Sequence, residues 1–370
     1  MLRFITAGES HGKALVGIVE GMVAGVRITE EEINEELRLR KRVWGRGPRA
    51  AIEEDVCEIL SGVAGGTTIG SPISLMIKNR EREAKPLTIP RPGHADLAGA
   101  IKHNFPHFHL VAERASARET AMRVAVGKVA KKFLSEWGID FFSHTVMIGG
   151  IKSNVKLENF NEATKKARKK SALYSMDEKG EARMKEKIRA AKKKGDTLGG
   201  MCEILVRGVP PGLGSYTHYD RRLDCRLAGS LMSIPSVKAV EIGDGISASG
   251  MYGSQFHDAL YFEKRAKRLT NRAGGIEGGV SNGETISLRL YVKPLPTLKK
   301  GLPSFELKTK KRAKAPYVRS DICVVPSVGI IGEAVAAWEI CCLFMEKFGG
   351  DSVDEVKRNF NSYMENVRKF

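Results

Sequence analysis

Two segments with apolar residues at helical spacing and little room for polar groups constrain the fold more than any other feature of the chain. The first covers residues 118–134 and the second covers residues 332–348. Apolar residues at this spacing form a broad face of the helix, which other elements must cover. The spacing therefore predicts two core helices.

Short stretches near these two helices match each other in the same order along the chain. Residues 63–78 and 276–293 both run through two glycines, a turn, a further glycine and then Ile-Ser-Leu in an apolar strand. Matches in the same order indicate an internal duplication, with chance similarity between glycine-rich strands as the alternative. We expect pseudo-repeated halves at about 1–136 and 200–348.

The expected fold class is α+β, a β-α-β sandwich built from the two pseudo-repeated halves with the core helices between sheets. The 370 residues are enough for one large core, so we expect residues 1–370 to form a single domain. A lysine-rich helical excursion at about 160–196 separates the halves. Because this segment is poor in apolar residues, we expect it to be solvated.

The charge and the cysteines narrow the class of protein. The net charge of +18 fits nucleic acid, an anionic membrane or small polyanions as partners. The six cysteines show no CxxC spacing, which favours thiols of a reducing compartment over a metal site. No signal-peptide pattern occurs, and no uninterrupted apolar run reaches the roughly 18 residues of a membrane helix. We expect a cytoplasmic protein without a membrane or metal partner.

The first candidate site is the turn GESHGK at residues 8–13. It is one residue short of a P-loop, and Ala14 stands where a P-loop needs Ser or Thr. Ser10 and His11 are neighbours, so in an extended segment they point to opposite faces and do not form a dyad. The glycines allow close approach of the backbone to a ligand, which makes His11 a candidate binding residue.

Further candidate residues lie in loops rich in arginine, glycine and proline. In RLRKRVWGRGPR, basic residues at a helix C-terminus can complement the helix dipole, but arginines in the glycine loop are better explained by bidentate capture of phosphate or carboxylate. The stretch PRPGHAD fixes Arg91 and His94 between prolines and a glycine, and Ser116 is placed to cap a helix next to Arg118. Because the arginines lie in separate loops, we favour a flat cofactor with a phosphorylated substrate over a polynucleotide.

The chain resembles the chorismate synthase family through seven motifs that occur in the family's order: GESHG, GRGPR, RPGHAD, ERASARETAMRVAVG, RAGGIEGGVSNG, KPLPT and RSD. The resemblance implies a carbon–oxygen lyase of the shikimate pathway. This enzyme eliminates phosphate from 5-enolpyruvylshikimate 3-phosphate in a 1,4-anti sense and gives chorismate, the precursor of the aromatic amino acids. It also implies reduced FMN (FMNH2) as cofactor without net redox change, and a homotetramer.

The resemblance assigns roles to five catalytic residues. His11 would protonate or hydrogen-bond the reduced flavin near N1, and His94 would assist the departing phosphate. Asp321 would act with flavin N5 in removing the C6 proton, while Ser10 and Ser116 would support this hydrogen-bond network.

The remaining assignments are contacts to the two ligands. The implied substrate contacts are Arg40, Arg46, Arg49, Arg91 and Arg118. The implied FMN contacts are Arg114, Ala115, Ser116, Pro235, Ser236, Gly278, Lys293, Pro294, Leu295, Pro296, Thr297 and Arg319. The chain departs from the family at Pro235-Ser236, where an Asn-Ala pair is usual, so that contact stays an open question. HNFPHFH at 103–109 also departs from the family, and we expect its histidines at the surface.

The sequence leaves two alternative functions open. The first is a basic nucleic-acid-binding protein, supported by the net charge and the lysine-rich excursion. The second is a catalytically silent FMN-binding relative, against which the intact His11, His94 and Asp321 speak. NADPH is a candidate source of electrons for the flavin. The lack of a Rossmann motif favours a separate flavin reductase as its partner.

Overall fold

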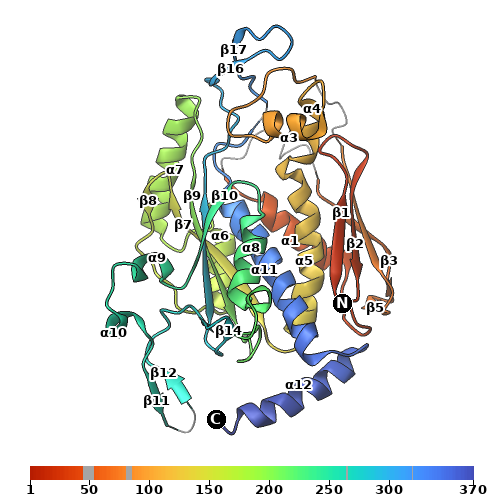
Figure 1. Cartoon of the computed structure of the whole chain (residues 1–370), viewed down its shortest axis with the longest axis vertical. Helices are drawn as coiled ribbons and strands as arrows, with labels where there is room; N and C mark the ends of the chain where they lie inside the picture. The colour runs from red at the N-terminus through yellow and green to blue at the C-terminus, as the bar shows by residue number, and fades with distance from the viewer. Residues whose placement is uncertain (45–53, 81–85, 264–265, 319) are drawn as a thin grey trace.

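Two antiparallel sheets with helices between them form the body of the protein (Figure 1). The computed structural model describes residues 1–44, 54–80, 86–263, 266–318 and 320–370. The first sheet has the order β1-β2-β6-β3 and the second has the order β10-β15-β9-β7-β8. The fold is therefore of mixed helix and strand composition, as expected.

The strands of the first sheet are β1 (Arg3–Ala7), β2 (Ala14–Glu20), β3 (Cys57–Ser61) and β6 (Ile73–Lys78). Those of the second are β7 (Asp140–Ile148), β8 (Ile151–Lys152), β9 (Gly200–Arg207), β10 (Val237–Ile242) and β15 (Ile286–Val292). The short hairpins are β4 (Val63–Ala64) with β5 (Thr67–Thr68), β11 (Leu260–Phe262) with β12 (Ala266–Arg268), β13 (Ile276–Glu277) with β14 (Val280–Ser281), and β16 (Pro303–Phe305) with β17 (Arg312–Lys314). Burial alternates along β6 and β15, so one face of each sheet meets the helices.

The inner helices are α1 (Glu30–Lys41), α5 (Thr120–Ser135), α8 (Leu223–Met232) and α11 (Val325–Phe348). The other helical elements are α3 (Asp96–His103), α4 (His109–Arg114), η1 (Ala117–Glu119), α6 (Glu162–Lys170), α7 (Glu178–Lys193), η2 (Tyr219–Arg221), α9 (Gly245–Ala248), α10 (Gly253–Phe256) and α12 (Val353–Val367). A capping box at Thr29 starts α1, as the sequence Thr-Glu-Glu-Glu predicts.

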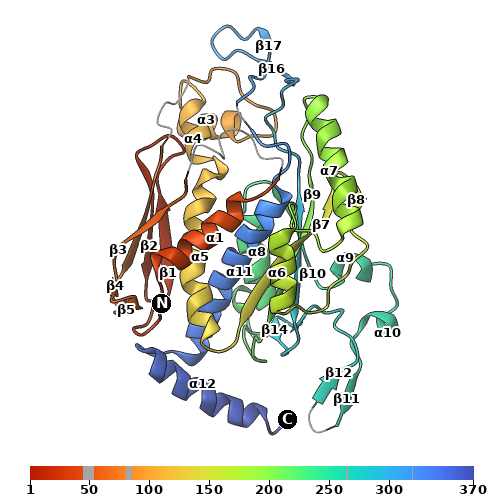
Figure 2. The same cartoon turned by 180° about the vertical axis from the view of Figure 1, so that it is seen from behind.

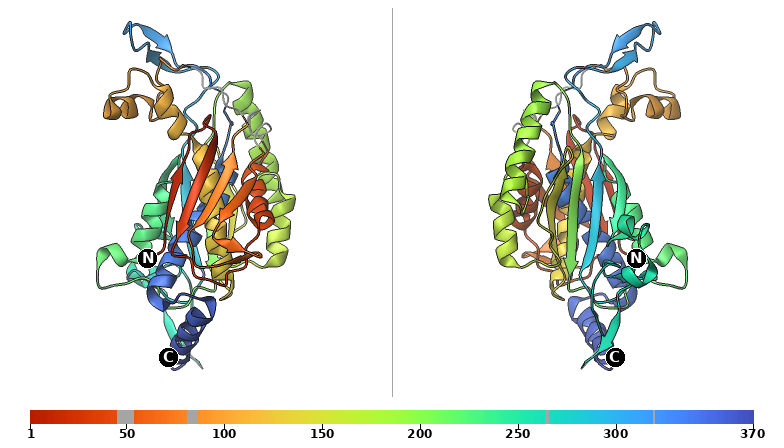
Figure 3. Two further views of the ribbon diagram at one scale, coloured as in Figure 1. Left: turned by 90° about the vertical axis from the view of Figure 1, so that its right-hand side faces the viewer. Right: turned by 90° about the vertical axis from the view of Figure 1, so that its left-hand side faces the viewer.

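The two predicted core helices are present and lie in the middle of the layers. α5 packs against the first sheet, α11 packs against the second, and the two helices contact each other along their length (Figures 1 and 2). At the crossing a Cβ on Gly127 would lie 2.5 Å from Cβ of Ala334, so only glycine permits this approach. The face-on views of the sheets show that both helices are covered on opposite sides (Figure 3).

α11 is also long and apolar enough to cross a membrane by length and composition. Within its most apolar stretch, 89% of the residues are buried inside the protein. The helix therefore has a covered position in the core of the fold rather than an exposed apolar surface.

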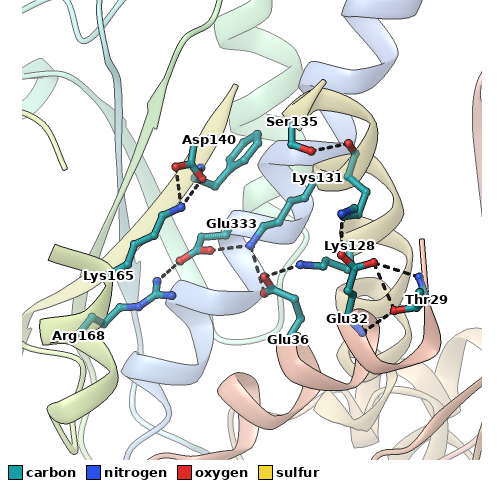
Figure 4. A network of polar contacts seen from close by, with 12 residues as sticks. Thr29, Glu32, Glu36, Lys128, Lys131, Ser135, Asp140, Lys165, Arg168 and Glu333 are labelled. Carbon is teal, nitrogen blue, oxygen red and sulfur yellow. Dashed lines mark hydrogen bonds and ion pairs between the residues drawn. The ribbon is translucent and has the colours of Figure 1, made fainter. Parts of the chain in front are cut away.

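A buried carboxylate in the middle of α11 joins four segments of the fold (Figure 4). Glu333 is 1% exposed, and it accepts hydrogen bonds from Lys131 Nζ at 2.6 Å and from Ser143 Oγ at 2.7 Å. Arg168 also donates to it. Lys131 in turn lies 3.2 Å from Glu36 of α1. Burial raises the pKa of Glu333, but Lys131 and Arg168 outweigh burial and hold it well below its ordinary value.

The lysine-rich excursion is helical, but the expectation that it is solvated is wrong for one side of it. Arg168 of α6 is 4% exposed because its guanidinium pairs with Glu333 in the core. Met184, Ile188 and Ala191 of α7 are buried at helical spacing beside β7 and β8. The excursion therefore belongs to the packed fold.

We expect Glu333→Gln to lower the free energy of unfolding by about 3–5 kcal/mol, because Lys131 and Arg168 would stay buried with a lost anionic partner. Urea denaturation at pH 7 measures this difference. The matched control is Glu339→Gln on the same helix, whose partner Arg226 lies nearer the surface, and we expect a loss below about 1 kcal/mol. Equal losses in the two variants would contradict the role given to Glu333.

Candidate functional site

A cavity of about 730 Å³ lies at the end of the sheets that carries α3 and α4 (Figure 1). Its wall is built from the β1–β2 turn, the end of α1, residues 86–95, the segment from α4 to η1, the segment after β15 and the segment before α11. These segments come from both halves of the chain. The packing of the two halves therefore determines the shape of the cavity.

Most of the predicted site residues that the structure describes line this one cavity. They are Ser10, His11, Arg40, Arg91, His94, Ala115, Ser116, Arg118, Pro235, Ser236, Lys293, Leu295, Pro296, Thr297 and Asp321. The sequence placed these residues in separate motifs, and the fold brings them together. Pro235 and Ser236 are among them, although they replace the residues usual in the family.

Three predicted FMN contacts do not line the cavity. The Arg114 guanidinium donates to the carbonyls of Thr6 and Gly8, and Gly278 lies in the β13–β14 hairpin. Pro294 lines a second, smaller hollow of about 400 Å³. The predictions for Arg46, Arg49 and Arg319 lie outside the described residues.

Glu113 holds His11 in place by two contacts. The His11 backbone N–H donates to Oε2 of Glu113 at 2.6 Å, and His11 Nδ1 lies 2.8 Å from Oε1. The Ser10 N–H also donates to the Glu113 carbonyl at 3.2 Å. Both side chains of the pair are largely buried. A carboxylate on Nδ1 fixes the ring orientation of the imidazole.

Asp96 holds Arg91 and His94 in the loop before α3. Its Oδ2 accepts from Arg91 N at 3.0 Å and from Arg91 Nε at 2.8 Å, while Oδ1 lies 2.6 Å from His94 Nδ1. Asp96 has no exposed surface. Burial raises its pKa, but the hydrogen bonds from Arg91 and His94 outweigh burial and keep it well below the ordinary value. The loop therefore presents a fixed Arg-His pair.

Asp55 joins the two predicted substrate arginines on another wall. Arg40 Nη1 donates to Asp55 Oδ2 at 3.0 Å, and Arg118 donates to Oδ1 of the same carboxylate. Thr120 Oγ1 and the Ala117 carbonyl accept from the other nitrogens of Arg40 at 3.0–3.2 Å. Both arginines are less than a tenth exposed.

Asn79 connects this arginine pair to the turn that carries His11. Its Oδ1 accepts from Arg118 Nε at 3.1 Å. Its Nδ2 donates to the carbonyls of Glu9 at 3.0 Å and Gly12 at 2.9 Å. The positions of His11 and Arg118 are thus linked through one amide side chain.

Sequence reasoning missed Asp55, Asn79, Asp96 and Glu113, because it counted Asp321 as the single candidate carboxylate. Asp96 lies within the motif RPGHAD, and Glu113 directly precedes Arg114, so both were visible as acidic neighbours of basic residues. Asp55 and Asn79 contact partners 15 to 70 residues away, and the spacing of apolar residues gives no signal for such pairs.

The rest of the wall is partly apolar. Leu87, Ile89, Pro296 and Val324 contribute flat or branched surfaces. His109 also lines the cavity, stacked on His107 with ring centroids 3.9 Å apart. The expectation that all histidines of HNFPHFH lie at the surface is therefore wrong for His109.

The cavity can bind multiply charged anions beside a flat ring system. Its volume lies in the range of ligand pockets, and guanidinium, imidazole and hydroxyl donors alternate with apolar surface. This donor set fits reduced FMN together with a phosphorylated carboxylic acid. Within the described ranges, no group of three or more His, Cys, Asp or Glu side chains is arranged to hold a metal ion.

Comparison with known proteins gives one family. The family model described as "Chorismate synthase" matches residues 2–345. The chain is 48% identical to the chorismate synthase of Desulforamulus reducens over all of both chains, and 48% identical to that of Alkaliphilus metalliredigens over 98% of this chain and 99% of that one. A solved structure titled "Crystal Structure of Chorismate Synthase" superposes with a TM-score of 0.84 at 40% identity, covering 100% of this chain and 99% of that one.

We expect Asp96→Asn to speed hydrogen exchange of residues 90–96 by roughly 100-fold, because the loop loses a buried ionic anchor of several kcal/mol. Hydrogen–deuterium exchange followed by mass spectrometry measures this. Asp220→Asn is the control, since Asp220 pairs with His218 at 2.7 Å and both of these side chains are exposed. Unchanged exchange in the Asp96 variant would mean that other contacts fix the loop.

Proposed function

Because the chain belongs to the chorismate synthase family, we propose that it catalyses the 1,4-anti elimination of phosphate from 5-enolpyruvylshikimate 3-phosphate to give chorismate. It is an enzyme with a small-molecule substrate, and we assign it to the carbon–oxygen lyases acting on phosphates, in aromatic amino acid biosynthesis. The observation that carries the proposal is the family match over residues 2–345, together with the cavity in which described residues of GESHG, RPGHAD, ERASARETAMRVAVG, KPLPT and RSD meet. The nucleic-acid-binding alternative is not supported.

We propose reduced FMN as the cofactor, without net redox change. The mixed apolar and cationic wall supports this choice. The residues that would hold the flavin line the cavity: Ala115, Ser116, Pro235, Ser236, Lys293, Leu295, Pro296 and Thr297. When bound, reduced FMN supplies negative charge transiently and so helps the C–O bond to phosphate break. Arg114, Gly278 and Pro294 do not line the cavity of this chain, so direct contact is proposed for the other residues.

We assign the leaving phosphate to the Arg91–His94 pair. The pair projects from one rigid loop, and both side chains line the cavity. Arg91 would hold the charge that develops on the phosphate oxygens as the C–O bond breaks. His94 is placed to donate a proton to the leaving group, since an imidazole donates protons near neutral pH.

The other proton of the elimination leaves from C6. We assign Asp321 to the removal of this proton, because it is the carboxylate in the wall next to the start of α11. His11 would hold a proton toward the cavity, with its Nδ1 side fixed by Glu113. Ser10 and Ser116 would complete the hydrogen-bond network, and the Ser116 hydroxyl caps η1.

Arg40 and Arg118 are the described candidates for the remaining anionic groups of the substrate. The substrate has a phosphate and two carboxylates, so it needs more than one cationic site. Both arginines are buried at the cavity wall, where a guanidinium interacts with an anion more strongly than in water.

We further propose that the chain is a single domain of two pseudo-repeated halves. Two observations support this. The order β1-β2-β6-β3 is repeated as β7-β9-β15-β10, and α1 and α5 occupy places equivalent to those of α8 and α11. In this alignment β7 belongs to the second half, ahead of the α6–α7 insertion. We also propose a cytoplasmic homotetramer whose flavin is reduced by a separate reductase using NADPH.

The test is an anaerobic assay of the purified protein with reduced FMN and 5-enolpyruvylshikimate 3-phosphate. We expect equal amounts of phosphate and chorismate, because one C–O bond to phosphate breaks for each chorismate formed. Reactions without flavin or with oxidised FMN are the controls, and we expect no product in them. Absence of chorismate in the complete reaction would refute the proposed function.

A further inference from the structure

We propose that Asp55 is a positioning residue for substrate binding, because its carboxylate holds Arg40 and Arg118 side by side at the cavity wall. The proposal rests on the proposed function, which makes the two arginines contacts of an anionic substrate. Asp55 itself lines the cavity and is 5% exposed.

The Asp55 carboxylate bridges segments of the chain that are separate in sequence. Arg40 is in the last turn of α1, Arg118 is in η1, and Asp55 comes two residues before β3. One oxygen of Asp55 faces each guanidinium. A shift of this carboxylate would therefore move both cationic groups relative to each other.

The negative charge of Asp55 also offsets the repulsion between the guanidinium groups of Arg40 and Arg118. Two guanidinium groups that are less than a tenth exposed repel each other and lose hydration, and both effects oppose their burial. A carboxylate between them offsets this repulsion. Burial by itself raises the pKa of Asp55, but attraction to Arg40 and Arg118 outweighs burial and lowers it, so the carboxylate stays ionised.

Residues other than Asp55 also hold the guanidinium groups of Arg40 and Arg118 in place. Thr120 Oγ1 and the Ala117 carbonyl orient Arg40, and Asn79 orients Arg118. Asn79 also ties Arg118 to the turn that carries His11. Among the described residues of this hydrogen-bond network, Asp55 is the one that contacts both arginines. Its role is thus preorganisation of two donors for an anion, which lowers the ordering cost of binding.

A competing account is that Asp55 only neutralises excess positive charge. The two accounts predict opposite changes in anion affinity for Asp55→Asn. Without the negative charge the pair becomes more cationic, so a merely neutralising Asp55 predicts tighter anion binding in Asp55→Asn. A positioning Asp55 predicts weaker binding in Asp55→Asn. It also predicts weaker binding in Asp55→Glu, which keeps the charge but moves the carboxylate by one methylene.

The experiment compares the wild type, Asp55→Asn and Asp55→Glu by steady-state kinetics with 5-enolpyruvylshikimate 3-phosphate under the anaerobic conditions above. We expect KM to rise about tenfold or more and kcat to fall in both variants, as for residues that orient a binding group. The matched control is Asp140→Asn, because Asp140 also holds two cations, Lys165 and Arg207, away from the cavity. Its KM should stay within about twofold of the wild type.

Calorimetric titration of the flavin-free protein with 5-enolpyruvylshikimate 3-phosphate provides a readout that does not depend on turnover, because we expect no reaction without flavin. We expect the dissociation constant to rise about tenfold in both Asp55 variants. If the wild type forms no chorismate but shows this Asp55-dependent binding of 5-enolpyruvylshikimate 3-phosphate, the proposed function fails and the positioning role stands. An unchanged or lower KM and dissociation constant in Asp55→Asn, or wild-type values in Asp55→Glu, would overturn the proposal. Thermal denaturation confirms that each variant is folded, and Asp55→Glu alone decides the question if Asp55→Asn does not fold.

Discussion

The close packing of α5 on α11 is the contact on which the rest of the structure depends. Gly127 lets the helices approach until Ala334 fills the space of the missing side chain. α5 packs against the first sheet and α11 packs against the second. The distance at which the two helices cross therefore fixes the distance between the sheets. The chain segments that lead into both helices, through Arg118 and Asp321, line the cavity. The same packing thus stabilises the core and shapes the site.

Ion pairs between buried basic side chains and carboxylates recur in the core and at the cavity. The chain has a net charge of +18, yet its buried cations contact carboxylates: Glu333 in the core, and Asp55, Asp96 and Glu113 at the cavity. Such pairs are costly to bury and costly to break, so they determine geometry more than they add stability. At the cavity they leave arginine and histidine side chains in fixed positions. This arrangement suits the anionic substrate and anionic cofactor that we propose.

Much of this architecture could be predicted from the sequence, because local patterns report local structure. The apolar spacing predicted α5 and α11, and the Thr29 capping box predicted the start of α1. The motif residues from Ser10 to Asp321 were identified as one site. The partners of the cations were not predicted, since a pair such as Arg118 and Asp55 depends on how distant segments meet. The burial of Arg168 was hidden by its lysine-rich surroundings, although the spacing of Met184, Ile188 and Ala191 was a signal for a packed face of α7.

The central claim is that the cavity between the starts of α5 and α11 is where the substrate and the flavin meet. The most direct measurement is a crystal structure of the protein with oxidised FMN and 5-enolpyruvylshikimate 3-phosphate bound together. We predict that both ligands lie in this cavity, with anionic groups of the substrate within hydrogen-bond distance of Arg40 and Arg118 and its phosphate near His94. Ligands bound at another place, or a substrate in the cavity that contacts none of these three residues, would contradict the account.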